Sequence, residues 1–427
     1  MQRIARRLWW AFVRDLEGRS WLASPVHLAW LGDQATGLLR FFRAVLGPDG
    51  WFSDLDADGR VVASPEQRLL CVARAVHSFA LGERLGVPGC RAVVDAGLTA
   101  MWEDHRDPGH GGGYLAGVGR DGPIDTTKAA YDHAFVLLAG ASATQAGHPE
   151  AGELFDDTLS VIDEHFWSDV EGASREAFDR DWRELESYRG ANSNMHLCES
   201  LLAAADAADR PDLAARAERL ASKLIDGYAR INDWLLPEHY DPSWQPLWDY
   251  NHDRLDDRFR PFGATIGHSL EWSRLVVSAG LATGRLDDWC LDAAEALFER
   301  AVAVGWDQDH GGLAYTVGWD GKPANPDHYW WPVAEGIAAA SYLFRLTGRA
   351  VYEGWYRRFW EYAANVLMDH ERAGWYPIFD PENRPKTQPW RGKPDVYHIL
   401  QACLLPALPV ASSVMGAATR SETEGLE

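Results

Sequence analysis

Cysteine is scarce in this chain of 427 residues, and its pattern excludes two kinds of stabilising site. The 5 cysteines are widely spaced, odd in number and without a Cys-x-x-Cys pair: Cys71, Cys90, Cys198, Cys290 and Cys403. This pattern argues against a structural zinc site and against a disulfide framework. We interpret the thiols as small buried groups in a reducing compartment.

Basic residues and long apolar runs are also scarce. The chain has 41 Lys and Arg residues against 63 Asp and Glu residues, a net charge of -22. Phosphates and anionic lipids bind basic faces, so we expect neither nucleic acid nor a membrane surface as a partner. No run approaches the roughly 18 apolar residues of a membrane span, and the apolar run 8–13 is too short for a secretory signal. We expect a cytoplasmic protein.

Aromatic residues are abundant, with 21 Trp, 14 Tyr and 15 Phe. Large rings fill helical cores, and we expect that role for most of the tryptophans. A minority of such rings can instead line a cavity that binds the apolar faces of sugars.

A repeat organises the chain. Aromatic-led loops recur near positions 51, 111, 167, 234, 311 and 375, at intervals of roughly sixty residues. Between them lie alanine-rich stretches with helical periodicity, such as 191–208, 212–231 and 332–346. Six helical hairpins closing on themselves predict an all-α fold, the (α/α)6 barrel. We expect the long loops to wall a funnel-shaped site at one end.

The domain organisation follows from this repeat. We expect residues 1–411 to form a single barrel domain. The segment 412–427, which contains Ser421-Glu422-Thr423-Glu424, is expected to be a flexible tail.

Two histidine–glutamate pairs stand out within the predicted helices. Glu199 follows His196 by three residues, and Glu271 follows His268 by three, so each pair shares one helix face. Imidazole titrates near neutral pH, which suits proton transfer at carbon. The pairs predict acid–base chemistry at a shared pocket, with Glu271 orienting His268 or raising its basicity.

The same motifs, in order, resemble the N-acylglucosamine 2-epimerase superfamily from about residue 66 to residue 408. They are Arg189-Gly190-x-Asn192-x-Asn194-Met195-His196, Gly267-His268-x-x-Glu271-Trp272, Trp331-Pro332-x-x-Glu335 and Asp395-x-Tyr397-His398. Three segments resemble its mannose isomerase and sulfoquinovose isomerase branch: Ala73-Arg74-x-x-His77, Trp248-Asp249-Tyr250-Asn251 and Arg258-Phe259-Arg260.

The resemblance implies an (α/α)6 barrel that interconverts an aldose and a ketose of a free monosaccharide without a metal or other cofactor. It implies that the acid–base pair is His268 and His398. It also implies that four residues bind the sugar: Arg74, His196, Arg258 and Glu271. Further candidates for the pocket are His77, Glu335 and Asn192, although Asn192 or Asn194 can instead cap the helix of His196.

Aldose–ketose isomerisation removes the proton from C2, returns one to C1 and moves a proton between O1 and O2 through a cis-enediol. That chemistry needs a base in contact with carbon and donors at the oxygen that becomes charged. His268 and His398 are the candidates for proton transfer, and the sequence leaves open which one takes the C2 proton. Metal-assisted hydride transfer is not expected, because the carboxylates are scattered along the chain.

Several functions remain open at this stage. The absence of an extra basic cluster favours neutral D-mannose and D-fructose over a sulfonated sugar. Sulfoquinovose isomerase and sugar 2-epimerase are the alternatives within the superfamily. A glycoside hydrolase would need a carboxylate pair such as Glu271 and Glu335. A non-catalytic sugar-binding protein ranks last, and the oligomeric state is not encoded in any motif.

Overall fold

The computed structural model describes residues 20–393 and 396–424, and for residues 422–424 the backbone alone. The apolar run 8–13 and the motif residue Asp395 lie outside the described residues. Within them, no helix is both long enough and apolar enough to cross a lipid bilayer.

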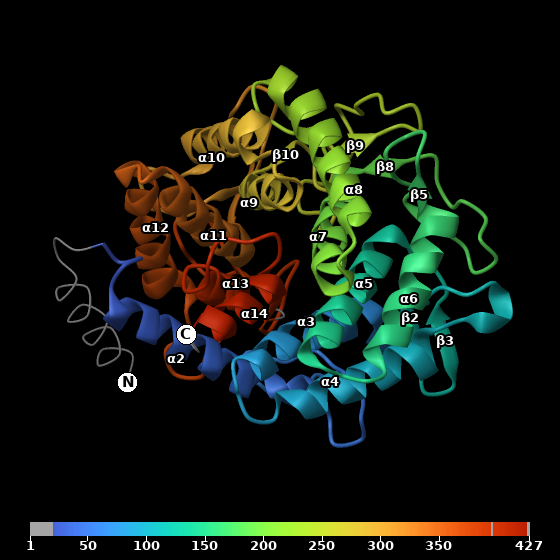
Figure 1. Ribbon diagram of the computed structural model, residues 1–427. Coiled ribbons are helices and arrows are strands. Elements are labelled where there is room, and N and C mark those ends of the chain that lie inside the picture. Colours follow the sequence, from blue (N-terminus) through green and yellow to red (C-terminus); the bar gives the residue numbers. More distant parts are fainter. Residues whose placement is uncertain (1–19, 394–395, 425–427) are drawn as a thin grey trace.

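Two concentric rings of helices form the molecule (Figure 1). The outer ring consists of α2 (Pro25–Phe42), α4 (Cys90–Thr99), α6 (Ala151–Val161), α8 (Pro211–Ala221), α10 (Leu291–Gly305) and α12 (Ala350–Tyr362). The inner ring consists of α3 (Leu69–Arg84), α5 (Ala130–Ala146), α7 (Ala191–Ala208), α9 (Ile266–Thr283), α11 (Trp330–Thr347) and α13 (Tyr397–Leu404).

The inner ring is closed. Each inner helix contacts the next one along the chain, and α13 contacts α3. Each inner helix also packs against the outer helix that follows it, and α13 packs against α2. These contacts confirm the predicted (α/α)6 barrel.

The residue pattern explains which helices lie inside. The outer helix α8 buries Leu213, Ala214, Ala217, Leu220 and Ala221, a stripe with helical spacing on an otherwise polar helix. The inner helices are buried on most sides, since α5 buries every residue from His133 to Ala143. Glycines with positive φ end three inner helices, where other residues would be strained: Gly147, Gly284 and Gly348.

The strands of the fold are short and lie in the loops that join outer to inner helices. Three form one antiparallel sheet: β1 (Glu66–Arg68), β2 (Gly117–Gly119) and β3 (Gly122–Asp125). Four form another: β10 (Ala264–Thr265), β11 (Ala314–Val317), β12 (Pro323–Tyr329) and β13 (Ile378–Phe379). The remaining pairs are β4 (Lys128–Ala129) with β7 (Ala177–Phe178), β5 (Trp167–Ser168) with β6 (Ala173–Ser174), and β8 (Arg189–Gly190) with β9 (His239–Tyr240).

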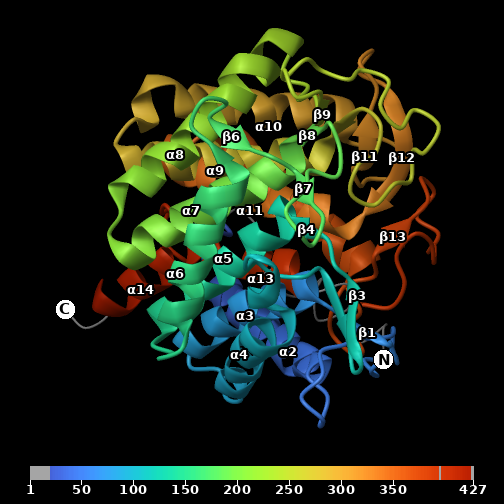
Figure 2. The ribbon, with the colours of Figure 1, turned by 90° about the vertical axis from the view of Figure 1, so that its right-hand side faces the viewer.

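These strands fix where the inner helices begin. Five of them directly precede an inner helix, namely β1, β4, β8, β10 and β12. Their antiparallel pairing joins successive repeats, as Lys128 pairs with Phe178 and Arg189 with Tyr240. In Figure 2 the strands labelled β1, β3, β11, β12 and β13 lie at one end of the barrel.

A recurring turn lies in the same loops. An aspartate carboxylate accepts hydrogen bonds from the backbone N–H groups two and four residues later, as Asp179 does from Asp181 and Arg183. The residue three positions after the aspartate has a positive φ each time. The four turns begin at Asp56, Asp179, Asp241 and Asp380, and the positive-φ residues are Gly59, Trp182, Trp244 and Asn383.

The opposite end of the barrel is closed by the C-terminal segment, contrary to the expected flexible tail. Helix α14 (Val414–Glu424) lies at this end in Figure 2, and Met415 and Ala417 on it are fully buried. The hydroxyls of Ser412 and Ser413 donate to the carboxylate of Asp206 at 2.7 and 2.5 Å. This apolar stretch is short and is followed by a polar end, so its burial was not expected from the sequence.

We expect Met415→Ala to destabilise the protein by about 2–5 kcal/mol, because it leaves a cavity beneath the inner ring. Val351→Ala is the control, since Val351 is 48% exposed on an outer helix, and it should change stability by less than about 0.5 kcal/mol. Urea unfolding of both variants measures the difference. Equal, small effects would contradict the packing of α14.

Candidate active site

A pocket opens at the strand-bearing end of the barrel, and it has a volume of about 450 Å³ including its mouth. Its lining comes from inner helices and from loops between repeats: Arg74, Tyr131, Asn192, His196, Arg258, Phe259, His268, Glu271, Tyr315, Trp330, Trp331, Trp390 and His398. The structure thus brings together both predicted catalytic histidines, all four predicted sugar-binding residues and Asn192.

His268 is held by a carboxylate that no sequence motif indicated. It is the third residue of α9, and its Nδ1 lies 3.0 Å from Oε1 of Glu238. Glu238 directly precedes β9 and also accepts a bond of 3.4 Å from the backbone N–H of Thr265. The expectation that Glu271 orients His268 is therefore wrong, because Glu238 occupies that position. With Nδ1 engaged, Nε2 is the nitrogen left for a ligand.

His398 is held in the same way. Its Nδ1 lies 2.7 Å from Oε1 of Glu335, and Arg274 donates to the other oxygen of that carboxylate at 3.4 Å. Burial pushes the pKa of Glu335 upward, but Arg274 and His398 outweigh it and keep the pKa below its ordinary value. Glu335 is thus an ionised partner behind the pocket wall and is not a lining residue.

The indole of Trp331 lies next to both histidines. Its ring centroid is 5.2 Å from that of His268 and 5.6 Å from that of His398. A Cβ on Gly267 would come within 2.1 Å of this indole, so the helix needs glycine at that position. Gly267 and Trp331 belong to two different motifs, and nothing in the sequence indicated that they pack against each other.

Another part of the pocket lining combines cationic, aromatic and neutral polar groups. Arg74 donates to the hydroxyl of Tyr131 at 2.9 Å and lies over the ring of Phe135 at 4.4 Å. Burial lowers the pKa of His196 to about 4, although Glu199 lies 3.6 Å from its Nδ1. His196 is therefore neutral near neutral pH and suits hydrogen bonding to a ligand.

Two loops meet at the mouth of the pocket. Arg258 donates to the carbonyl of Pro389 and lies over the ring of Trp390 at 4.9 Å. Arg260 bonds instead to Glu186 at 2.6 Å. Arg258 is thus the arginine of this segment that lines the pocket.

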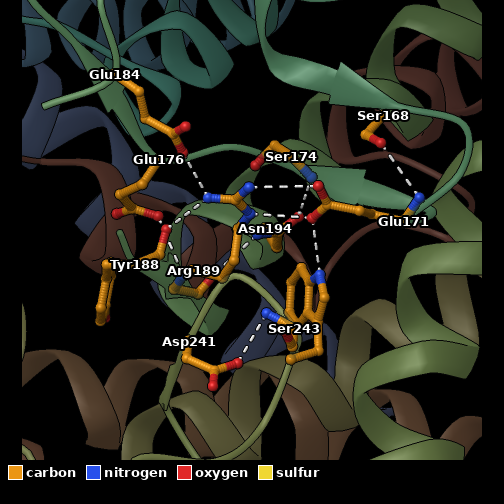
Figure 3. Close-up of polar contacts among 12 residues, drawn as sticks. Ser168, Glu171, Ser174, Glu176, Glu184, Tyr188, Arg189, Asn194, Asp241 and Ser243 are labelled. Atoms are coloured by element: carbon orange, nitrogen blue, oxygen red, sulfur yellow. Dashed lines mark hydrogen bonds and ion pairs between the residues drawn. The ribbon is translucent and has the colours of Figure 1, made fainter. Parts of the chain in front are cut away.

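The start of α7 is anchored by the arginine of its motif (Figure 3). Arg189 donates to Glu171 at 3.0 Å and to Glu184 at 2.7 Å. Asn194 accepts from the backbone of Ser174 and donates to the carbonyl of Gly190, both at 2.8 Å. These bonds fix the helix turn that carries Asn192 and His196, so Asn194 has the structural role and Asn192 lines the pocket.

Carboxylates that are scattered in sequence converge beneath the pocket. Arg274 Nη2 lies 3.5 Å from Glu199, 3.8 Å from Glu271 and 3.4 Å from Glu335. Subsets of these groups with His196 or His398 are close enough to share a metal ion. A guanidinium already stands among all three carboxylates, so the donor set suits a divalent ion poorly.

His77 lies away from this pocket. It is 1% exposed, and its Nδ1 lies 2.7 Å from the hydroxyl of Ser142. Burial lowers its pKa to about 4. The expectation that His77 and Glu335 line the pocket is therefore not met.

The closed ring of hairpins with a polar and aromatic pocket at one end defines an (α/α)6-barrel protein. A solved structure of a D-mannose isomerase superposes with a TM-score of 0.83 and 30% identity, covering 88% of this chain and 97% of that one. A D-mannose isomerase of Pseudomonas cannabina pv. alisalensis is 42% identical over 93% of this chain and 97% of the relative. One from Thermobifida fusca is 43% identical over 93% and 98%.

A sequence model of the N-acylglucosamine 2-epimerase (GlcNAc 2-epimerase) family matches residues 50–402. The chain belongs to this family, which confirms the resemblance seen in the motifs.

The close contact between Gly267 and the indole of Trp331 can be tested by measuring stability. We expect Gly267→Ala to destabilise the protein by about 1–3 kcal/mol, because the methyl group overlaps the indole of Trp331. Gly354 on α12 has no neighbour within 4 Å of an added Cβ, so Gly354→Ala should stabilise the protein by up to about 1 kcal/mol. Chemical denaturation compares the two variants. Equal stabilisation of both variants would show that there is free space beside Gly267, and it would contradict the contact with Trp331.

Proposed function

We propose that this protein is a sugar isomerase that interconverts D-mannose and D-fructose through a cis-enediol intermediate. The observation that carries the proposal is the pair of pocket histidines, each bonded through Nδ1 to a buried glutamate. The relatives named D-mannose isomerase, at 42% and 43% identity over almost the whole chain, support the choice of substrate.

The mechanism uses the protein's own side chains. One imidazole, through Nε2, removes the proton from C2, and the electrons of that C–H bond form the C1–C2 double bond of the enediol. The carbonyl electrons of C1 move onto O1, which takes up a proton. O2 then loses its proton as the C2 carbonyl forms, and C1 receives a proton, which completes the ketose. Glu238 and Glu335 fix the orientation of the two rings and stabilise the charge that each imidazole gains. Which histidine contacts C2 is an open assignment.

The remaining pocket groups bind the sugar. Arg74 and the neutral His196 supply donors to its oxygens, while Trp331 offers a flat surface next to the two histidines. No metal or other cofactor is part of this proposal, since the guanidinium of Arg274 already lies among the buried carboxylates.

The charge of the pocket supports a neutral sugar. Arg74 and Arg258 are its lining arginines, and Arg260 is engaged by Glu186 at 2.6 Å. A sulfonated hexose would need further cationic donors, so sulfoquinovose isomerase is the alternative. A 2-epimerase is the second alternative, because return of the proton to the other face of C2 uses the same groups. A hydrolase is disfavoured, since Glu335 stands behind the wall.

We also place the activity in the cytoplasm, a proposal supported by five free cysteine thiols within the described residues. A free monosaccharide is the expected small-molecule partner.

The substrate and the cofactor requirement can be tested together. Purified protein is incubated with D-mannose, D-glucose, N-acetylmannosamine and sulfoquinovose, each before and after exhaustive treatment with EDTA. We expect D-fructose from D-mannose, with equal rates before and after chelation. If ketose formed chiefly from sulfoquinovose, the substrate would be sulfoquinovose and not D-mannose. Loss of activity that manganese or cobalt restores would overturn the metal-independent mechanism.

The acid–base pair can be tested by substitution. We expect His268→Ala and His398→Ala each to lower kcat by at least ~10²–10⁴-fold, because each removes a group that moves a proton. The double variant should lose much less than the product of the two losses. His310→Ala is the control, since His310 lies in an exposed loop and should leave kcat unchanged. A single variant that retains most activity removes that histidine from the mechanism.

A further inference from the structure

Three buried glutamates share one cation beneath the pocket. Glu199, Glu271 and Glu335 are 6%, 0% and 1% exposed, and each has an oxygen within 3.8 Å of Arg274 Nη2. Like charges repel strongly in surroundings of low dielectric constant. Three ionised carboxylates around one guanidinium are therefore unfavourable, and a proton on one of them relieves the repulsion.

The hydrogen bonds identify which glutamate carries that proton. Glu199 accepts from the hydroxyl of Tyr397 and from Gln401 at 3.4 Å. Glu335 is bonded to His398 and Arg274. By contrast, neither carboxyl oxygen of Glu271 has a hydrogen-bond partner among the residues described. Glu271 is thus the carboxyl group whose negative charge is least stabilised.

The charged groups around Glu271 also favour its protonated form. Burial, and then the negative charges of Glu335 and Glu199, raise its pKa well above the ordinary value, against Arg274 and Arg74. The charged and titratable groups around it come from every neighbouring inner helix: Arg74 on α3, His196 and Glu199 on α7, His268 and Arg274 on α9, Glu335 on α11, and Tyr397 and His398 on α13.

We propose that Glu271 acts as a neutral carboxylic acid that donates a hydrogen bond to the substrate oxygen on which the enediolate charge develops. The inference rests on the proposed isomerase function and assigns one residue within it. Glu271 lines the pocket one helical turn from His268, so it faces the same ligand. An ionised carboxylate there would repel the enediolate, whereas a neutral donor stabilises it.

Glu271 keeps its proton throughout the step, so its charge does not change. As an imidazole removes the C2 proton, the C–H electron pair forms the C1–C2 double bond. The carbonyl π pair moves onto O1. The acid proton of Glu271 stays on its carboxyl group while the hydrogen bond to that oxygen strengthens. A buried carboxylic acid kept neutral for this purpose has a known counterpart in ketosteroid isomerase.

The test compares two replacements of Glu271. Glutamine keeps a neutral donor of the same size, so we expect Glu271→Gln to retain kcat within about tenfold of the wild type. Alanine removes the donor, so Glu271→Ala should lose about 10²–10³-fold in kcat. Glu335→Gln is the matched control, because it neutralises a carboxylate held ionised, and it should be strongly impaired. Equal inactivation of Glu271→Gln and Glu271→Ala would overturn the proposal.

Two further readouts separate a donor from a merely structural group. The wild-type pH profile should fall at high pH, where Glu271 loses its proton, and Glu271→Gln should lack that fall. The infrared difference spectrum between wild type and Glu271→Gln should contain the carbonyl stretch of a protonated carboxyl group. This spectrum needs no turnover, so it tests the inference even if the protein does not isomerise mannose. A carboxylate band in its place would overturn the proposal.

Discussion

The buried guanidinium of Arg274 is the interaction on which the rest of the site depends. It is 4% exposed, and it holds carboxylates from α7, α9 and α11 together beneath the pocket. Without it the inner helices would bring uncompensated negative charges into the core, which is strongly unfavourable. Because Glu335 in turn bonds to His398, the guanidinium also positions one of the two histidines. The packing of three inner helices and the position of one candidate catalytic histidine are thus coupled through a single cation.

Much of the fold could be predicted from sequence, because the repeat is recognisable from short local patterns. Glycine turns, aromatic-led loops and alanine-rich stretches each act over a few residues, and their recurrence indicates helical hairpins. The pocket residues His268 and His398 could be predicted through the resemblance to the N-acylglucosamine 2-epimerase superfamily. Both lie near the starts of inner helices, which the barrel brings to one end. The C-terminal helix α14 could not be predicted, since its four buried apolar residues lie within a segment that is otherwise polar.

The partners of the site residues could not be predicted from sequence. Glu238 reaches His268 only through the pairing of β8 with β9, and neither strand has more than two residues. Helical spacing placed Glu271 beside His268, but the side chain instead joins the cluster of Arg274. The indole of Trp331 reaches both histidines only because Gly267 lacks a side chain. Each of these contacts is a product of packing between repeats.

In the proposed mechanism, hydrogen moves between C2 and C1 of the sugar as a proton carried by imidazole. The most direct measurement is turnover of D-mannose in heavy water, stopped at low conversion, with deuterium at C1 of D-fructose measured by NMR. The pocket is open at its mouth, and imidazole protons exchange with solvent, so we expect deuterium at C1. D-fructose formed without deuterium at C1 would indicate a direct hydride shift and would contradict proton transfer by imidazole.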